Sequence, residues 1–219
     1  MNRLHRHLIL VLLIVANGWG VCCAQPWVRV DWVADGDTII LQGGRHVRYI
    51  GIDAPEIDHQ YQRAAPLGYA ARSTNRQLVA GRQLRLVYDR ERHDHYGRTL
   101  AYVYRRDGLF VNAELLKQGL AHVSLRPPNT GQQQTLLAAQ RNAMQAGRGL
   151  WRWVTKDAVP KQPYQGNRRS MRFHAADCPN GKRISPKNRI QLENQWAAFW
   201  SGFAPARGCM VFPPAVDDR

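Results

Sequence analysis

Short apolar runs separated by turn residues dominate the first half of the chain. Residues 28–33, 38–41 and 46–52 are rich in Val, Ile, Leu and Tyr, and Asp-Gly or Gly-Gly pairs separate them. β-Branched runs of this length between turn signals are typical of strands, so we predict a three-stranded meander. Residues 83–88 and 99–104 show the same pattern and predict two further strands.

Three segments have the spacing of amphipathic helices. They are residues 67–80, 110–118 and 132–146, and a glycine follows each of them directly. Glycine just beyond the last apolar position is a common end signal for a helix. Five strands interrupted by one helix and followed by two more favour an α+β protein that is mainly a β barrel.

The first 24 residues differ from the rest of the chain. Arg3 and Arg6 precede an apolar run over residues 8–16, and small residues end at Ala24. This pattern predicts a cleaved secretory signal and therefore export, either to the periplasm or out of the cell. An uncleaved anchor and a lipid-anchored Cys22 or Cys23 are the alternatives. The apolar run is shorter than the roughly 20 residues that a membrane span needs.

Charge narrows the choice of partners. The 219 residues include 31 Lys and Arg against 16 Asp and Glu, and 26 of the basic residues are Arg. Residues 25–154 carry 18 basic against 11 acidic residues, and residues 155–219 carry 11 against 5, so the excess is spread along the chain. Arg binds phosphate through two parallel hydrogen bonds, so we expect a nucleic-acid partner. The alternative is a basic surface for solubility or for an anionic membrane.

Three polar clusters follow predicted strands, and each has a simple structural explanation. The segment 35–38, Asp-Gly-Asp-Thr, fits a hairpin turn. The segment 53–56, Asp-Ala-Pro-Glu, fits the capped start of a helix. The segment 96–98, Tyr-Gly-Arg, fits a turn between the last two strands.

Taken together, the three clusters suggest phosphodiester chemistry. They supply three carboxylates and, with the neighbouring strand, two guanidinium groups: Asp37, Asp53, Glu56, Arg48 and Arg98. Carboxylate oxygens without a His or Cys cluster suit Ca²⁺ or Mg²⁺. Two Arg can neutralise charge that develops on a phosphate, and a third carboxylate can deprotonate water.

The order and spacing of four blocks resemble the thermonuclease, or micrococcal nuclease, family between residues 27 and 153. These blocks are Asp35–Thr38, Arg48–Glu56, Asp94–Tyr102 and Asn112–Ala121. The resemblance implies a five-stranded OB-fold barrel with three helices. It also implies an endonuclease, a hydrolase that cleaves both DNA and RNA and leaves 3′-phosphate ends.

The resemblance further implies one Ca²⁺ ion and a set of roles. Asp37 and Asp53 are expected to bind the metal through their carboxylates, and Ala54 through its backbone carbonyl. The catalytic residues implied by the resemblance are the general base Glu56 and the phosphate-stabilising pair Arg48 and Arg98.

Two neighbouring residues are expected to bind substrate. His95 stands where the family often has a Lys that contacts a terminal phosphate of the substrate, and Tyr96 lies beside it. Because imidazole titrates near pH 6.5, this contact predicts pH-dependent binding. His93, Asp94 and His95 also have the composition of a transition-metal site, but without a fourth ligand a polar hairpin loop is the simpler interpretation.

Beyond the resemblance, residues 155–167 are polar with two Pro and predict a linker, and residues 168–219 predict a small accessory module. The module faintly resembles small His/Cys units that end in Pro-Cys-x-x-Cys, with Ala206 in place of the first Cys. His174, Cys178 and Cys209 are therefore one ligand short of a closed Zn²⁺ site. Given export, we favour a disulfide between Cys178 and Cys209 over zinc.

The C-terminal aromatic residues leave one alternative open. Trp196, Phe199, Trp200 and Phe203 fall at helical spacing, and we favour a small core over a platform for stacked bases.

The prediction is an exported Ca²⁺-dependent nuclease domain over residues 25–154, monomeric and without a stable membrane span after signal cleavage. Two other classes of protein fit parts of the pattern. One is an exported OB-fold protein that binds nucleic acid without cutting it. The other is a basic structural or membrane-surface protein, which does not require three carboxylates at these spacings.

Overall fold

A computed structural model describes residues 26–58, 63–158, 160, 162–210 and 212–213. The predicted signal segment lies outside the described residues. In the part that is described, no helix is both long enough and apolar enough to cross a bilayer.

The first part of the chain forms a strongly curved five-stranded sheet. Its spatial order is β1 (Val30–Val33), β2 (Thr38–Leu41), β3 (His46–Tyr49), β6 (Thr99–Arg105) and β5 (Leu84–Val87). The β3–β6 pair is parallel and the other pairs are antiparallel. The backbones of Val28 and Leu84 exchange two hydrogen bonds, so the first and last strands meet at one point. The predicted five-stranded OB-type α+β architecture is confirmed, although the ladder of strands does not close into a complete barrel.

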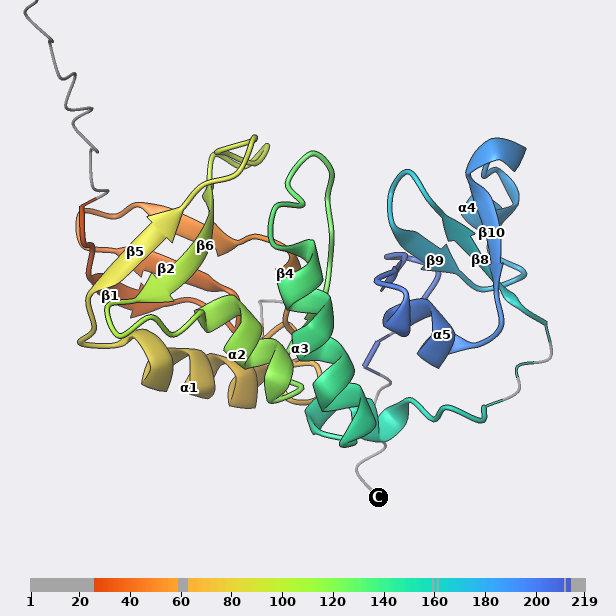
Figure 1. The fold of residues 1–219 in the computed structure, drawn as a ribbon, viewed down its shortest axis with the longest axis horizontal. Coiled ribbons are helices and arrows are strands. Elements are labelled where there is room, and N and C mark those ends of the chain that lie inside the picture. The colour runs from red at the N-terminus through yellow and green to blue at the C-terminus, as the bar shows by residue number, and fades with distance from the viewer. Residues whose placement is uncertain (1–25, 59–62, 159, 161, 211, 214–219) are drawn as a thin grey trace, which may run out of the picture.

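The three predicted helices are present and enclose the apolar side of this sheet (Figure 1). They are α1 (Gly68–Val79), α2 (Val111–Lys117) and α3 (Gln133–Gln145). The helices bury the faces that their spacing predicts, for example Leu136, Ala143 and Met144 of α3.

One predicted strand is divided in two. Residues 46–52 were expected to form a single strand, but β3 ends at Tyr49 and β4 (Ile52–Asp53) pairs separately with β7 (His122–Val123). Gly51 lies between them with φ of 79°, a conformation that favours glycine. A Cβ atom there would lie 2.5 Å from a methyl group of Leu136. Because of the break, Asp53 pairs with β7, whereas Arg48 pairs with β2 and β6.

The C-terminal part forms a second sheet with two short helices. Its spatial order is β10 (Arg189–Leu192), β8 (Tyr164–Asn167), β9 (Arg172–His174) and β11 (Ala204–Pro205). The helices are α4 (Pro179–Lys182) and α5 (Gln195–Trp200), and 3₁₀ turns occupy Gly149–Trp153 (η1) and Pro186–Asn188 (η2). β8 lies inside the segment predicted as a linker, because Tyr164–Asn167 pairs with both β9 and β10. We call the described chain from β8 onward, residues 164–210 and 212–213, the module.

The module packs against α3 rather than standing apart from it (Figure 1). Ala143, Met144 and Trp151 share one buried cluster with Phe173 and Phe199. The Gln140 side chain crosses the contact, because its oxygen accepts from the backbone N–H of Val123 at 2.6 Å and its nitrogen donates to the Phe199 carbonyl at 2.6 Å. Two of the four C-terminal aromatics, Phe199 and Phe203, are buried as the small-core interpretation expects.

Candidate active site

Asp37 ends the loop between β1 and β2, and its carboxylate is almost fully buried. Its oxygens accept from the Thr38 hydroxyl at 3.1 Å and from the Ala54 backbone N–H at 2.7 Å. The preceding Gly36 packs so closely that a Cβ atom would lie 2.5 Å from the Cβ of Ala54 and 2.7 Å from that of Ala71. Glycine is therefore needed here for close packing, and the loop has four residues rather than the two of a tight hairpin.

A buried amide holds this loop against the neighbouring strand. The Asn75 side chain on α1 donates to the Asp35 carbonyl at 3.0 Å and accepts from the Tyr49 hydroxyl at 2.9 Å. Because Tyr49 follows Arg48 on β3, this link fixes the loop relative to the strand that carries Arg48.

Arg48 lies between the two predicted metal-binding aspartates. One nitrogen of its guanidinium contacts Asp37, and the other donates to Asp53 at 2.5 Å. The Arg48 side chain is only 14% exposed, and the Asp37 and Asp53 side chains are 6% and 20% exposed. The two carboxylates therefore both lie beside the Arg48 guanidinium.

Two hydrogen bonds fix the backbone at Asp53 and Ala54. The Asp53 carbonyl is 2.8 Å from Nδ1 of His122, whose ring is buried edge-on against Phe199 of the module. The backbone N–H of Ala54 donates to the Asp37 carboxylate, so the backbone that follows Asp53 is tied to the second carboxylate of the pair.

Glu56 lies at the edge of this group, with a side chain that is 45% exposed. Its backbone carbonyl accepts from the Ala65 N–H at 2.9 Å. A Cβ atom on Gly68 would lie 2.3 Å from the same carbonyl, so glycine permits the start of α1 to pack beneath this segment. A carboxylate in this position is accessible to water.

Arg98 follows the turn between β5 and β6 and is held by Asp94. Its side-chain Nε donates to Asp94 at 2.7 Å, and its backbone N–H donates to the other oxygen of the same carboxylate at 2.9 Å. Both carboxylate oxygens of Asp94 are therefore used to position Arg98, which does not support the transition-metal alternative for residues 93–95.

An open cavity of about 360 Å³ lies beside Arg48 and Arg98, and we call it the front cleft. The side chains of Asp37, Asp53 and Glu56 are not part of its lining. Arg48 and Arg98 line it together with the predicted substrate-binding residues His95 and Tyr96. The His95 and Tyr96 rings contact each other with centroids 3.7 Å apart, and Tyr96 is 73% exposed. The structure therefore brings both residues to the mouth of the cleft that contains the two arginines.

Burial and charge act against each other at these groups. Burial alone would raise the pKa of Asp53, but Arg48 and the other nearby cations lower it below its ordinary value. Burial raises the pKa of Asp35, and the attraction of Arg48 offsets only part of that effect. Burial likewise lowers the pKa of Arg48, against the opposing effect of Asp53. Asp53 is therefore held in its charged form by the arginine beside it.

The donor set fits a hard divalent cation. Carboxylates from Asp37 and Asp53 contact different nitrogens of one guanidinium, so both are within reach of a single positive group. Ca²⁺ prefers several oxygen ligands and tolerates irregular geometry, which matches carboxylate and backbone oxygens better than a nitrogen or sulfur set.

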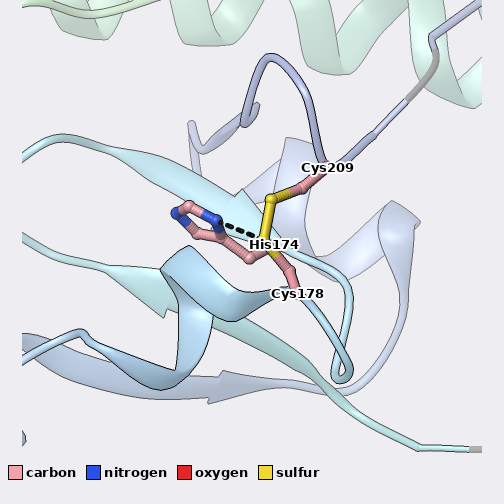
Figure 2. The surroundings of a disulfide bond; sticks show 3 residues. All are labelled: His174, Cys178 and Cys209. Carbon is pink, nitrogen blue, oxygen red and sulfur yellow. Dashed lines mark hydrogen bonds between the residues drawn. A yellow bond between two sulfur atoms is a disulfide. The ribbon is translucent and has the colours of Figure 1, made fainter.

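The C-terminal cysteines form a separate group. Cys178 and Cys209 are joined by a disulfide with Cα atoms 5.8 Å apart, and Nδ1 of His174 is 3.4 Å from the Cys178 sulfur (Figure 2). In the described ranges these three residues are also the one set of three or more His, Cys, Asp or Glu side chains whose ligand atoms all lie within 4.8 Å of one another. Burial lowers the pKa of His174. Ala206 offers no side-chain ligand, so the disulfide remains the interpretation we favour.

Several residues at the site were not predicted from the sequence. Asn75, His122 and Arg207 all act from a distance in the sequence, and nothing in their spacing indicates the contact. Arg207 comes from the module, and one of its nitrogens is 3.4 Å from Asp53 and 3.8 Å from Glu56. Asp94 belongs to one of the four blocks that carry the resemblance, but residues 94–98 form a turn and not a helix, so its contact with Arg98 was not predicted either.

Comparison with known proteins gives consistent results. The profile of the family described as staphylococcal nuclease homologue matches residues 46–153. A thermonuclease of Staphylococcus intermedius is 39% identical over 125 residues, which cover 56% of this chain and 74% of that protein. An uncharacterized endonuclease of Escherichia coli O157:H7 is 35% identical over 164 residues, covering 74% of this chain and 96% of that protein. Endonuclease YncB of Bacillus subtilis is 43% identical over 108 residues, covering 47% of this chain and 51% of that protein.

Proposed function

Because the chain belongs to the staphylococcal nuclease homologue family and is a phosphodiester-cleaving enzyme, we propose that it hydrolyses DNA and RNA at the site around Arg48 in a Ca²⁺-dependent reaction. The observation that carries this proposal is the contact of one buried guanidinium with both Asp37 and Asp53. A basic protein that only bound nucleic acid would not need to bury two carboxylates beside its phosphate-binding arginines.

The two arginines bind the scissile phosphate. Arg48 lines the front cleft from β3, and Arg98 lines the same cleft from the turn before β6. Asp94 holds Arg98 in place through both oxygens, so little side-chain freedom is lost when phosphate binds. Donors fixed in this way stabilise the charge that develops on the phosphate oxygens in the transition state.

Glu56 acts as the general base. Its exposed carboxylate takes a proton from water, and that water attacks phosphorus. The bond from phosphorus to the 5′ oxygen breaks and that oxygen takes up a proton from solvent, so the products are a 3′-phosphate and a free 5′-hydroxyl. His95 and Tyr96 at the mouth of the cleft contact the neighbouring parts of the substrate.

Asp37, Asp53 and the Ala54 carbonyl would hold the cation. When bound, Ca²⁺ supplies positive charge that polarises the phosphate. The protein contributes the preformed carboxylate pair, fixed by Thr38, Ala54 and the backbone contact to His122.

Export is part of the same proposal. The first 24 residues carry the features of a cleaved secretory signal. The disulfide between Cys178 and Cys209 suits an oxidising compartment such as the periplasm or the outside of the cell.

Cleavage of single-stranded DNA, plasmid and RNA with Ca²⁺, with Mg²⁺ and with chelator tests the proposal. We expect cleavage that requires Ca²⁺ and leaves 3′-phosphate ends. Glu56→Gln should lower the rate about 100-fold or more because the base is lost. The matched control is Glu114→Gln, at a half-buried position of α2 that does not line the front cleft, which should cleave at the wild-type rate. Tight binding without cleavage under every metal condition would overturn the proposal and identify a nucleic-acid-binding protein.

A further inference from the structure

A second cleft, of about 690 Å³, begins at Asp53 and extends along the module. We call it the module cleft. Its walls come from the nuclease part at Arg126 and Pro127 and from the module on the opposite side. Five arginines line it: Arg126, Arg169, Arg172, Arg183 and Arg207. Its acidic lining is limited, within the described residues, to Asp53, so the cleft is strongly positive.

The module cleft is continuous with the front cleft. Arg126 and Arg207 line both cavities. Arg207 also reaches Asp53 and Glu56, at 3.4 and 3.8 Å. A polynucleotide strand bound in the front cleft can therefore continue past Arg207 into the module cleft and remain beside arginine side chains.

Most of this charge is not neutralised by the protein itself. The side chains of Arg126, Arg169 and Arg183 are exposed and form no hydrogen bond or ion pair with any described residue. Arg172 is more buried, and burial together with repulsion from Arg126 lowers its pKa. Arginines that crowd one another without carboxylate partners favour an anionic occupant.

The two walls of the cleft are held at a fixed separation. The Arg172 guanidinium donates to the Ser124 hydroxyl at 3.0 Å and to the Leu125 carbonyl at 3.4 Å. Gln140 and the aromatic cluster shared with α3 also hold the module against the nuclease part. A preformed cleft loses little conformational entropy when a ligand binds.

We propose that the module cleft binds the single-stranded segment of the polynucleotide that adjoins the scissile phosphate. A positively charged groove that follows a sugar–phosphate backbone is typical of sites for single strands. Several arginines along one continuous path match a series of phosphates better than one isolated anion. The inference rests on the proposed nuclease function, because it continues the same strand out of the front cleft.

The test compares two double variants of the whole protein in chelator, where no cleavage is expected. Arg169→Ala with Arg183→Ala removes two charges from the cleft. Arg168→Ala with Lys187→Ala removes two exposed charges of the module that do not line the cleft. Binding of a fluorescently labelled oligothymidylate of twenty nucleotides is measured by fluorescence anisotropy over a series of salt concentrations.

The cleft variant should bind the oligonucleotide about tenfold more weakly at moderate salt. The slope of log K against log salt should fall by about 1.4, from roughly 0.7 per lost phosphate contact on a single strand. The control variant should retain the wild-type slope. An unchanged slope in the cleft variant, or an equal loss in both variants, would overturn the proposal.

A second measurement separates this proposal from the nuclease assignment. With Ca²⁺ and a chromogenic single-nucleotide phosphodiester, the cleft variant should retain the wild-type kcat, because that substrate does not reach the module. If the wild type cleaves nothing, the nuclease function fails, whatever the binding data show. If the wild type cleaves but the variant loses activity on the single-nucleotide substrate as well, the module cleft is not a flanking-strand site.

Discussion

The front cleft and the module cleft are both rich in arginine, but the arginines are paired differently. In the front cleft, Arg48 contacts Asp37 and Asp53, and Arg98 is held by Asp94. Of the five arginines that line the module cleft, Arg207 alone contacts a carboxylate within the described residues. The side chains of Arg169 and Arg183, and of Arg126, which lines both clefts, have no such partner there.

This difference indicates two distinct roles for arginine in the two clefts. Carboxylate partners fix the direction of a guanidinium and balance its charge, which suits a group that must meet one phosphate in one geometry. Arginines without such partners leave a net positive field, which attracts a polyanion with little demand on geometry. We infer that the front cleft serves the proposed chemistry and that the module cleft serves binding.

The largest expected effect comes from breaking the paired geometry of the front cleft. Arg48→Lys keeps the positive charge but removes the fork that reaches Asp37 and Asp53, so cleavage should slow by about 100-fold or more. Steady-state cleavage of a short oligonucleotide measures this. Arg45→Lys, the same change at an exposed position before β3, is the control. A loss below threefold in Arg48→Lys would show that the fork is not used.

The next effect comes from detaching the module. Gln140→Leu leaves the Val123 N–H and the Phe199 carbonyl buried without a partner, which should destabilise the protein by about 2 kcal/mol or more. Urea unfolding measures the change, and the salt dependence of oligonucleotide binding should weaken with it. Gln145→Leu, an exposed position on the same helix, is the control. Stability equal to wild type would mean that Gln140 does not hold the module in place.

Arg207 tests the junction between the two clefts. Arg207→Ala should lower kcat/KM for an oligonucleotide about tenfold, and the salt slope should fall by about 0.7 because one phosphate contact is lost. Arg168→Ala provides the comparison at another exposed position of the module. A faster reaction in Arg207→Ala would indicate that Arg207 obstructs the carboxylates instead of binding substrate.

The smallest expected effect concerns the loop that carries Arg126. Asp89 accepts hydrogen bonds from the Tyr102 hydroxyl at 2.9 Å and from the Gly131 N–H at 2.8 Å. Burial opposes ionisation of Asp89, but these bonds and that from the Arg90 N–H lower its pKa below the ordinary value of 3.8. Its contribution to stability is therefore complete above that pH and is lost as the pH falls through the lowered value.

Asp89→Asn should destabilise the protein by about 1 kcal/mol or less at neutral pH, because the group is partly exposed. The difference from wild type should shrink as the solution is acidified below pH 3.8, the ordinary pKa of the carboxyl. Thermal unfolding of both proteins across this range measures it. A difference that grows on acidification would contradict this pKa direction.

The sequence was sufficient to predict the elements of the first sheet, because their apolar residues alternate between clear turn signals. It did not reveal the break at Gly51, since a positive φ in the middle of an apolar run leaves no periodic signature. Residues 155–167 are polar enough to predict a linker, but Tyr164–Asn167 becomes a strand by pairing with Arg172–His174 and Arg189–Leu192, later in the chain. Local pattern does not report such pairing.

The candidate site divides in the same way. Asp37, Arg48 and Asp53 lie at strand ends near one another in sequence, so their spacing was informative. Arg207 reaches Asp53 across 154 positions, and only the docking of the module on α3 brings it there. Docking of the module depends on side chains such as Gln140. Nothing in the sequence distinguishes Gln140 from the other polar residues of its helix.

The most direct test of the account is cleavage of an oligonucleotide in water enriched in heavy oxygen, with Ca²⁺ present, followed by mass analysis of the fragments. Attack by water on phosphorus, with Glu56 as base, predicts a single heavy-oxygen label on the 3′-phosphate and an unlabelled 5′-hydroxyl. Fragments that carry 5′-phosphate ends, or product formation that is unchanged in Glu56→Gln, would contradict it.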